Sequence, residues 1–263
     1  MLLGGTFYAN KIEPNWFDVV SVRVTLPHLA QEFQNYRIVQ ISDLHVDDWM
    51  TQQKLQKIVT IINQQKPDLV ALTGDFVTYI PDDFARKMTT AFGQLKPKDL
   101  SVAVLGNHDH WTNAKTIRKV LKQSGIVDIS NDVTTIERKN AVLHIAGVDD
   151  FWVGKDRLDL VLDQLPGKDA AILLAHEPDF ADISSSTGRF DLQVSGHSHG
   201  GQVSIPFFGP PKLPLYGQKY PAGLYKIGKM FQYTNRGVGT VKPRVRFNCR
   251  PEITVFTLKT VGK

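Results

Sequence analysis

The stretch IVQISDLHV, residues 38–46, decides the fold, because an apolar strand runs directly into polar side chains that can bind ligands. Four more stretches repeat this design: VALTGDFV at 70–77, AVLGNHDH at 103–110, ILLAHEP at 172–178 and QVSGHSHGG at 193–201. In open α/β sheets, ligands bind outside the carboxyl ends of the strands. We therefore predict that five strand ends converge on one crevice.

Helix-like and strand-like segments alternate around these stretches. In residues 51–65, Leu55, Ile58, Val59 and Ile62 recur at helical spacing, and Thr51 is suited to be the N-cap. Further helices are expected at 82–95, 112–124, 156–165 and 178–184. Strands are expected at 19–26, 36–41, 68–73, 100–105, 133–138, 141–148, 170–175, 192–195, 202–205, 223–227, 230–234 and 252–258. The alternation favours an α/β fold, and we expect a layered α-β-β-α sandwich with mixed sheets and the site at the C-terminal ends of the strands.

Residues 1–263 contain no linker-like boundary, so we interpret them as a single domain in which 1–35 form an N-terminal extension and an edge strand. One segment stands apart, PFFGPPKLPLYGQKYPA at residues 206–222. Its prolines exclude a helix or a central strand. We favour a loop near the mouth of the site over a purely structural wrap.

The polar residues at the strand ends are of the metal-ligating kind. Carboxylates and neutral imidazoles suit Zn, Mn or Fe, and no thiolate accompanies them. Asp75 is the expected bridge between two ions, since Gly74 before it permits a tight turn. Two ions about 3.5–4 Å apart would accommodate the seven candidate ligands, which are too many for one tetrahedral ion: Asp43, His45, Asp75, Asn107, His176, His197 and His199.

The ordered motifs D-x-H, G-D, G-N-H-D, H and G-H-x-H make this sequence resemble the calcineurin-like metallophosphoesterases. The tail, with GGQVSIPFFGPPKLPLYGQKYPAGLYKIG and RFNCRPEITVFTL, is similar to their bacterial phosphodiesterase branch, which UDP-2,3-diacylglucosamine pyrophosphatase-type members also resemble. The motifs occur in order and without substitution as Asp43-Leu44-His45, Gly74-Asp75, Gly106-Asn107-His108-Asp109, His176 and Gly196-His197-Ser198-His199.

The resemblance implies a role for each of these residues. Asp43, His45 and His199 would hold one metal ion. Asn107, His176 and His197 would hold the second, with Asp75 between the two. His108 would act without binding metal, by protonating the leaving oxygen or stabilising the phosphoryl charge, and Asp109 would hydrogen-bond His108 and fix its orientation.

The implied activity is hydrolysis of phosphodiester or phosphomonoester bonds, by attack of a hydroxide that bridges two divalent ions of Mn, Fe or Zn. Three alternatives stay open: a non-catalytic scaffold on the same fold, a nuclease, and a lipid-pathway hydrolase of the UDP-2,3-diacylglucosamine pyrophosphatase type. Scaffold relatives typically lose ligands, and none is missing here.

The net charge of the chain indicates which kinds of molecule it binds. A net charge of +5 and a pI near 9.2 favour anionic partners. No long basic run or repeated aromatic platform supports a nucleic acid. We expect a phosphorylated small-molecule or lipid-linked substrate and no obligate protein partner. The basic residues Lys242, Arg244, Arg246 and Arg250 alternate as on one face of a strand, which we interpret as a solvated face.

No apolar stretch reaches the roughly 18 residues of a membrane span, and residues 1–9 lack the features of a signal peptide. We expect a cytoplasmic protein, with peripheral contact to the inner membrane left open. The single cysteine, Cys249, is expected to be a buried structural thiol. His110 is interpreted as structural, with substrate contact left open. Residues 149–154 either line the pocket or form an acidic turn. Arg236 is not counted among the site residues.

Overall fold

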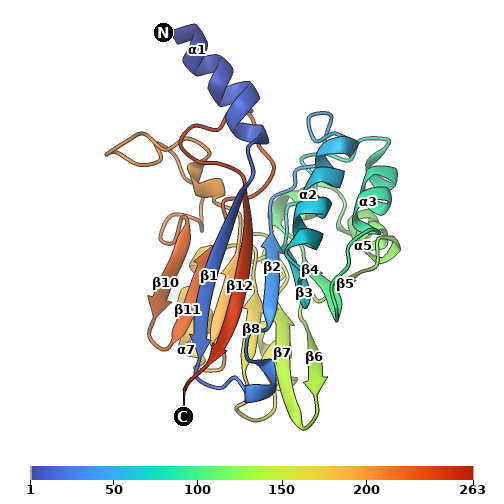
Figure 1. The fold of residues 1–263 in the computed structure, drawn as a ribbon, viewed down its shortest axis with the longest axis vertical. Coiled ribbons are helices and arrows are strands. Elements are labelled where there is room, and N and C mark those ends of the chain that lie inside the picture. The colour runs from blue at the N-terminus through green and yellow to red at the C-terminus, as the bar shows by residue number, and fades with distance from the viewer. Residues whose placement is uncertain (1, 263) are drawn as a thin grey trace.

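The computed structural model describes residues 2–262 and contains two six-stranded sheets that pack face to face (Figure 1). The first sheet has the order β1-β12-β2-β3-β4-β5 and the second β10-β11-β9-β8-β7-β6. The strands of the first are β1 Asp18–Leu26, β2 Arg37–Ile41, β3 Leu69–Thr73, β4 Leu100–Val104, β5 Ile126–Asp128 and β12 Glu252–Thr260. Those of the second are β6 Asp132–Arg138, β7 Ala141–Gly147, β8 Ala171–Leu174, β9 Leu192–Ser195, β10 Gly223–Ile227 and β11 Met230–Thr234.

Both sheets are mixed, as predicted. Strands β2 to β5 are parallel, and β12 runs antiparallel to β2. In the second sheet β7, β8, β9 and β11 are parallel, and the edge strands β6 and β10 run antiparallel to their neighbours. The consecutive parallel strands bring several carboxyl ends to the same edge of each sheet.

Helices cover the two outer faces. Helices α2 Gln52–Gln64, α3 Phe84–Phe92 and α5 Ala114–Gln123 pack on the first sheet, and α6 Leu158–Asp163 and α7 Ala181–Ser186 pack on the second. The layers are therefore α-β-β-α, as predicted. Short turns of 3-10 helix occur at Gln31–Phe33, Pro178–Phe180 and His199–Gly201.

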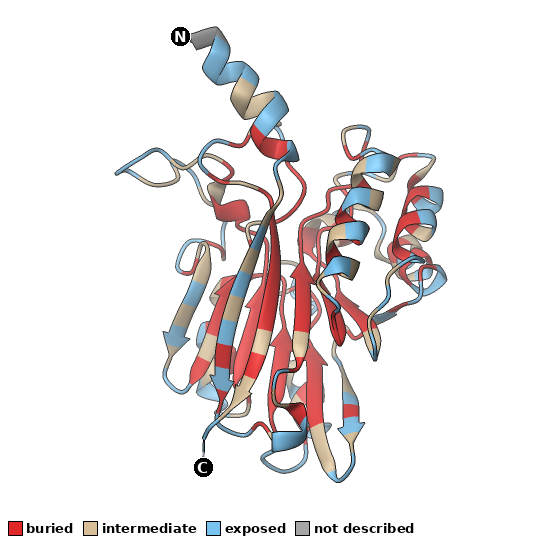
Figure 2. Cartoon of the chain, viewed as in Figure 1, coloured by how far each residue is buried: buried red, intermediate tan, exposed pale blue. Residues whose placement is uncertain are grey.

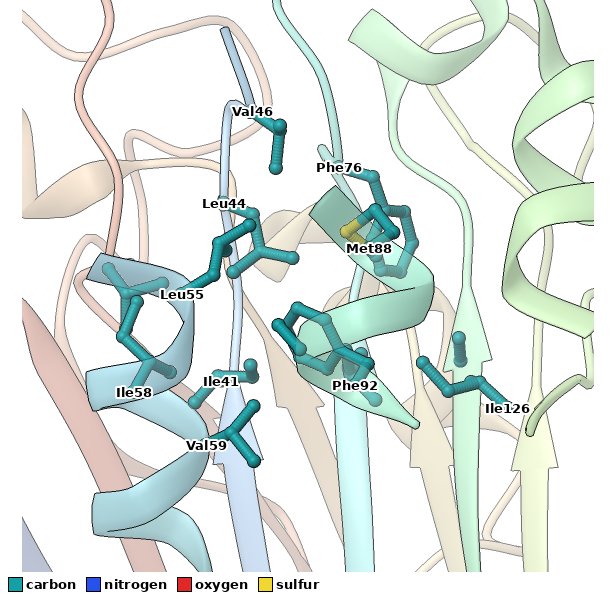
Figure 3. Packing of buried hydrophobic residues seen from close by; sticks show 14 of the residues in the cluster. Ile41, Leu44, Val46, Leu55, Ile58, Val59, Phe76, Met88, Phe92 and Ile126 are labelled. Carbon is teal, nitrogen blue, oxygen red and sulfur yellow. The ribbon is translucent and has the colours of Figure 1, made fainter. Parts of the chain in front are cut away.

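The central strands are buried on both faces. In β2, Val39 and Ile41 belong to the core on the helix side, where Figure 3 shows Ile41 among the side chains of α2. Ile38 instead belongs to the core between the sheets. A strand buried on both sides has a continuous apolar sequence. The edge strand β1 instead alternates between exposed and less exposed residues, as predicted for 19–26 (Figure 2).

Helix α2 forms where its apolar spacing predicts. Its four periodic side chains, Leu55, Ile58, Val59 and Ile62, are buried against the first sheet. Thr51 is the N-cap, because its side chain accepts a hydrogen bond from the backbone N–H of Lys54 at 3.2 Å. Burial of each such side chain stabilises the fold by roughly 1.5–3 kcal/mol.

Two predictions about the C-terminal part are wrong. Residues 202–205 form only isolated bridges, Val203 with Phe247 and Ile205 with Gly209. Gln202 has a φ of 59°, which turns the chain out of a strand path. The basic residues at 242–250 are neither a strand nor a solvated face. Arg246 is fully buried and donates hydrogen bonds to backbone carbonyls, including that of Gly239 at 2.8 Å, while Arg244 pairs with Asp47 at 2.6 Å.

Some elements were not predicted. They are β5, the short helix α4 Asn107–Thr112 and the N-terminal helix α1 Leu2–Phe7, which continues through a π-helical turn at Tyr8–Ile12 and a 3-10 turn at Glu13–Asn15. Within residues 2–262, no helix combines the length and apolarity needed to cross a bilayer. Cys249 is buried and free, as predicted. Met1 and Lys263 lie outside the described residues.

Candidate metal centre

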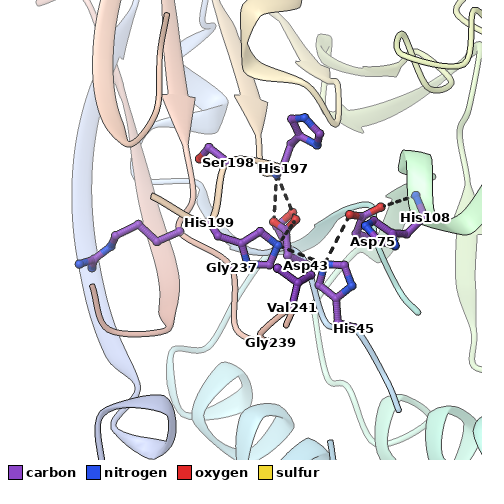
Figure 4. Close-up of polar contacts among 12 residues, drawn as sticks. Asp43, His45, Asp75, His108, His197, Ser198, His199, Gly237, Gly239 and Val241 are labelled. Carbon is purple, nitrogen blue, oxygen red and sulfur yellow. Dashed lines mark hydrogen bonds and ion pairs between the residues drawn. The ribbon is translucent and has the colours of Figure 1, made fainter. Parts of the chain in front are cut away.

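The candidate ligands meet where β2, β3, β4, β8 and β9 end, so the strand ends converge as predicted. Figure 4 shows five of them together: Asp43, His45, Asp75, His197 and His199. The loops after β2 and β3 lie side by side. The backbone N–H of Asp43 donates to the carbonyl of Gly74, and that of His45 donates to the carbonyl of Asp75, both at 3.0 Å. These bonds fix the first three candidate side chains relative to one another.

Most of these residues have an unusual backbone conformation. Five of the seven have left-handed φ angles: Asp43 53°, His45 45°, Asp75 54°, His197 69° and His199 53°. Such angles are uncommon outside glycine, cost of order 1–3 kcal/mol each and cluster at functional sites. The surrounding packing therefore holds these loops in shapes that local preference disfavours.

Gly74 permits the close approach of the loops. Its φ is 88°, and a Cβ atom there would lie 2.6 Å from Nδ1 of His176 and 2.7 Å from the backbone nitrogen of Gly106. Any larger residue would push apart the loops after β3, β4 and β8. Glycine is required here for both its backbone freedom and its small size.

The first group of ligand atoms comes from Asp43, His45 and His199. Nε2 of His45 lies 3.1 Å from Nε2 of His199, which in turn lies 3.3 Å from Oδ1 of Asp43. All three residues are buried. Burial lowers the pKa of His45 to about 4, which leaves its imidazole neutral and able to bind a cation.

The second group comes from Asp75, His176 and His197. Nδ1 of His176 is 2.7 Å from the carbonyl oxygen of Thr73, and Nε2 of His197 is 2.8 Å from that of Leu215. Carbonyl oxygens only accept hydrogen bonds, so these ring nitrogens carry the protons. When both rings are neutral, as metal binding requires, the lone pairs of the other two nitrogens face each other across 3.2 Å.

Asp75 lies between the two groups. Its Oδ2 atom is 3.4 Å from Nε2 of His45 and 3.4 Å from Nε2 of His176. Burial acts to raise the pKa of Asp75, but the neighbouring histidines in their charged form, His176 above all and then His45 and His108, together outweigh burial and hold that pKa well below its usual value. Asn107 adds a further acceptor, because its Oδ1 atom is buried without a hydrogen-bond partner. Unpartnered buried acceptors and facing lone pairs fit a bound cation.

Comparison with known proteins decides the family. Residues 36–201 match the calcineurin-like phosphoesterase family. Over 98% of its length the chain is 35% identical to the metallophosphoesterase YkuE of Bacillus subtilis, of which it covers 91%. The chain belongs to the calcineurin-like phosphoesterases. It is a metal-dependent phosphoester hydrolase.

Two further relatives and two solved structures are similar to this phosphoesterase. It is 30% identical to the phosphodiesterase YaeI of Escherichia coli, over 97% of this chain and 93% of that one. It is 28% identical to the UDP-2,3-diacylglucosamine pyrophosphatase LpxG of Chlamydia muridarum, over 95% of this chain and 91% of LpxG. It shares the fold of GAP50 of Plasmodium at 12% identity, with a TM-score of 0.52 over 84% of this chain and 80% of GAP50. It also shares the fold of the sulfate thiohydrolase SoxB of Thermus thermophilus at 12% identity, with a TM-score of 0.54 over 86% of this chain and 57% of SoxB.

His108 of the phosphoesterase lies beside the metal ligands. Its backbone N–H donates to Oδ1 of Asp75 at 3.0 Å, and a ring nitrogen lies within 4.8 Å of ligand atoms of His45 and Asp75. The ring contacts Trp111, with centroids 5.0 Å apart, and lines the adjacent cavity. His108 is therefore between the ligands and the space open to a substrate.

The prediction that Asp109 hydrogen-bonds His108 is wrong. The carboxyl oxygens of Asp109 instead accept hydrogen bonds from the backbone N–H groups of Gly106 at 2.9 Å, Phe76 at 2.8 Å and Val77 at 3.3 Å. Both carboxyl oxygens of this buried residue are thus paired with backbone donors. Asp109 thus joins the loop that carries Asp75 to the turn that carries Asn107.

A cavity of about 390 Å³ adjoins the candidate ligands. Trp152 lines it, which fits the pocket-lining interpretation of 149–154, and Pro211 to Pro214 of the 206–222 loop lie along its wall. Two parts of the cavity wall were not predicted from the sequence: Trp111, which follows the Asn-His-Asp-His run directly, and the segment 241–245. No sequence motif marks that segment.

Two other candidates lie in ion pairs. Nε2 of His110 is 2.7 Å from Oδ1 of Asp149, which fits the structural interpretation of His110. Arg236 pairs with Glu252 at 2.5 Å and with Asp18 at 3.0 Å, so leaving it out of the site was consistent with its contacts.

Proposed function

We propose that this phosphoesterase binds two divalent metal ions and hydrolyses phosphodiesters. One observation carries the proposal: Oδ2 of Asp75 is 3.4 Å from a ring nitrogen of each of two histidines that belong to separate ligand groups. A single oxygen in that position suits a bridge between two ions. The donor set of imidazole nitrogens and carboxylate oxygens suits Mn, Fe or Zn.

In this proposal, Asp43, His45 and His199 hold the first ion. Asn107, His176 and His197 hold the second, and Asp75 bridges. When bound, the ions supply positive charge for the phosphate oxygens and lower the pKa of bound water.

His108 is proposed to give a proton to the leaving oxygen. Its ring is half-buried, lines the cavity and is supported by Trp111. A histidine is suited to this role, because its ordinary pKa lies close to neutrality.

The cavity supports a diester rather than a monoester as substrate. Its lining is mainly apolar, with Trp111, Trp152, Leu213 and Val241, and only two lysines, Lys212 and Lys242, contribute cationic side chains. Organic groups on both sides of a phosphate would contact such walls, whereas a dianionic monoester would gain more from fixed cations. The similarity to a relative named as a phosphodiesterase agrees.

The decisive experiment combines metal analysis with turnover of bis-p-nitrophenyl phosphate. We expect two equivalents of transition metal per chain, hydrolysis that is lost on chelation, and a rate for Asp75→Asn lower by about a hundredfold or more. Asp169→Asn, at an exposed position, is the matched control. A protein with full metal content and no turnover would instead favour the non-catalytic scaffold, and salt-sensitive cleavage of DNA would favour a nuclease.

A second candidate is hydrolysis of a lipid-linked sugar nucleotide. The observation that favours it is the 28% identity to the UDP-2,3-diacylglucosamine pyrophosphatase LpxG over 95% of the chain. Release of UMP from UDP-2,3-diacylglucosamine, at a higher kcat/KM than for the aryl diester, would establish it.

A further inference from the structure

The hairpin formed by residues 205–209, which we call the aromatic tip, exposes two adjacent phenylalanines. Phe207 is 105% exposed and Phe208 is 87% exposed relative to an extended reference, and Ile205 is 44% exposed. Large apolar side chains that are this accessible mark surfaces that bind a partner or a membrane. The aromatic tip projects from the molecule as a narrow loop (Figure 2).

Hydrogen bonds define the shape of the aromatic tip. The backbone N–H of Ile205 donates to the carbonyl of Gly209 at 2.9 Å, and that of Gly209 donates back at 2.8 Å. The N–H of Phe208 donates to the carbonyl of Ile205 at 3.0 Å, and Phe207 has a φ of 70°. Both rings are therefore held outward by a closed turn, and their exposure does not result from a frayed segment.

The base of the aromatic tip is joined to the N-terminal helix. The N–H of Ser204 donates to the carbonyl of Phe247 at 2.9 Å. Arg246, which precedes Phe247 in the chain, donates its N–H to the carbonyl of Ala9 at 2.8 Å. Phe247 is 40% exposed and Phe7 is 61% exposed. Figure 1 shows helix α1 and the loop that follows β9 extending from the same end of the molecule. Exposed aromatic side chains thus come from three chain segments at this end.

Positive charge accompanies these side chains. Between Asp191 and Glu252 the sequence contains nine lysines and arginines and no acidic residue. Lys11, Lys212 and Lys242 are exposed, and they form no ion pair with the described residues. Exposed aromatic rings together with cations that have no acidic partner are complementary to an anionic lipid surface, where rings enter the headgroup layer and cations approach the phosphates.

We infer that this end of the phosphoesterase docks on an anionic phospholipid surface through Phe207 and Phe208, with the neighbouring lysines facing the lipid phosphates. A narrow, convex tip fits insertion between headgroups better than it fits a protein interface, which needs roughly 800 Å² on each partner. Docking would hold the cavity at the headgroup layer, because Lys212 and Lys242 also line it. The inference does not rest on the proposed function, since binding is measured without catalysis.

The experiment is co-sedimentation of the full chain with vesicles of phosphatidylcholine containing phosphatidylglycerol, compared with pure phosphatidylcholine. We expect binding to the anionic vesicles that weakens as salt is added. The double variant F207S/F208S should bind about tenfold or more weakly, while it keeps wild-type turnover of the soluble aryl diester. The control is L160S/I183S, two residues on α6 and α7 that are each 41% exposed, and it should bind like the wild type.

Several results would overturn the inference. One is the absence of sedimentation with anionic vesicles, and another is equal binding by wild type and F207S/F208S. A third is a wild-type protein that does not bind vesicles but forms a dimer in solution, with the dimer dissociated by the F207S/F208S substitutions. This result would assign the aromatic tip to contact with a second copy of the chain. Absence of turnover in the wild type itself, together with binding to anionic vesicles, would count against the proposed function while it supports docking.

Discussion

Nε2 of His176 lies 3.2 Å from Nδ1 of His197, while a backbone carbonyl holds the other nitrogen of each ring. In the neutral rings, both facing nitrogens are acceptors, so nothing attractive joins them directly. A proton or a metal cation between them removes this repulsion. Asp75 lies 3.4 Å from Nε2 of His176 and adds a negative charge at the same point.

Divalent metal should therefore stabilise the fold. We expect Mn²⁺ or Zn²⁺ added to chelator-treated protein to raise the free energy of unfolding, by about 2.7 kcal/mol at a hundredfold excess over Kd. Because ligand nitrogens must be unprotonated to bind, the gain should grow as pH rises. Thermal unfolding with and without metal measures it. His197→Ala should lose most of the gain, whereas His144→Ala, far from the candidate ligands, should keep it.

Asp109 should stabilise the loops after β3 and β4 rather than orient His108. Replacement by Asn turns one acceptor oxygen into an NH₂ group, which then faces a backbone N–H of Gly106, Phe76 or Val77. We expect Asp109→Asn to lower the free energy of unfolding by about 1–3 kcal/mol and to reduce metal affinity. Urea unfolding and metal titration measure both. A variant with unchanged stability and a shifted pH–rate profile would instead support the role that the family resemblance implies, in which Asp109 orients His108.

The sequence predicts the sheets, their layers and the convergence of strand ends, because alternation and apolar runs depend on local spacing. Thr51 and the four buried side chains of α2 illustrate this. The errors arise where distant segments determine the contact. Arg246 resembles a surface cation in sequence, yet carbonyls of residues 236–249 surround it. Asp109 was paired with its neighbour in sequence, although its nearest donors include two residues more than 30 positions away.

Gly74 should be irreplaceable even by alanine. A Cβ at this position would lie 2.6 Å from Nδ1 of His176, on a backbone with a φ of 88°. We expect Gly74→Ala to destabilise the fold by several times the roughly 1 kcal/mol that a left-handed alanine costs alone, and to abolish turnover. Gly228→Ala is the matched control, because its φ is 57° and a Cβ there meets nothing within 4 Å. Equal losses of stability in the two variants would refute the argument from crowding.

Asp149 should make the stability depend on pH. Burial acts to raise its pKa, but His110 and Arg118, each 2.7 Å away, outweigh burial and hold the pKa below its usual value of 3.8. A carboxyl whose pKa is lower in the folded state stabilises the fold above the unfolded pKa, and this contribution is lost as pH falls through the folded pKa. Asp149→Asn should therefore lower the free energy of unfolding at pH 7 by about 1–3 kcal/mol. The difference from wild type should shrink below about pH 3.8, as urea unfolding at both pH values would measure; a difference that stays constant would contradict it.

His108 should matter most when the leaving group is poor. An alkoxide needs a proton as it departs, whereas p-nitrophenolate is stable without one, so removal of a proton donor affects the two substrates unequally. We expect His108→Ala to slow hydrolysis of an alkyl phosphodiester by about a hundredfold or more and that of bis-p-nitrophenyl phosphate much less, with metal content unchanged. Trp111→Phe is the control, because it keeps an aromatic ring at the position where Trp111 contacts His108, with centroids 5.0 Å apart, and it should change the rates for both substrates by the same factor. If His108→Ala instead loses metal and slows both substrates equally, His108 is a ligand together with His45 and Asp75, the third cluster whose atoms lie within 4.8 Å of one another.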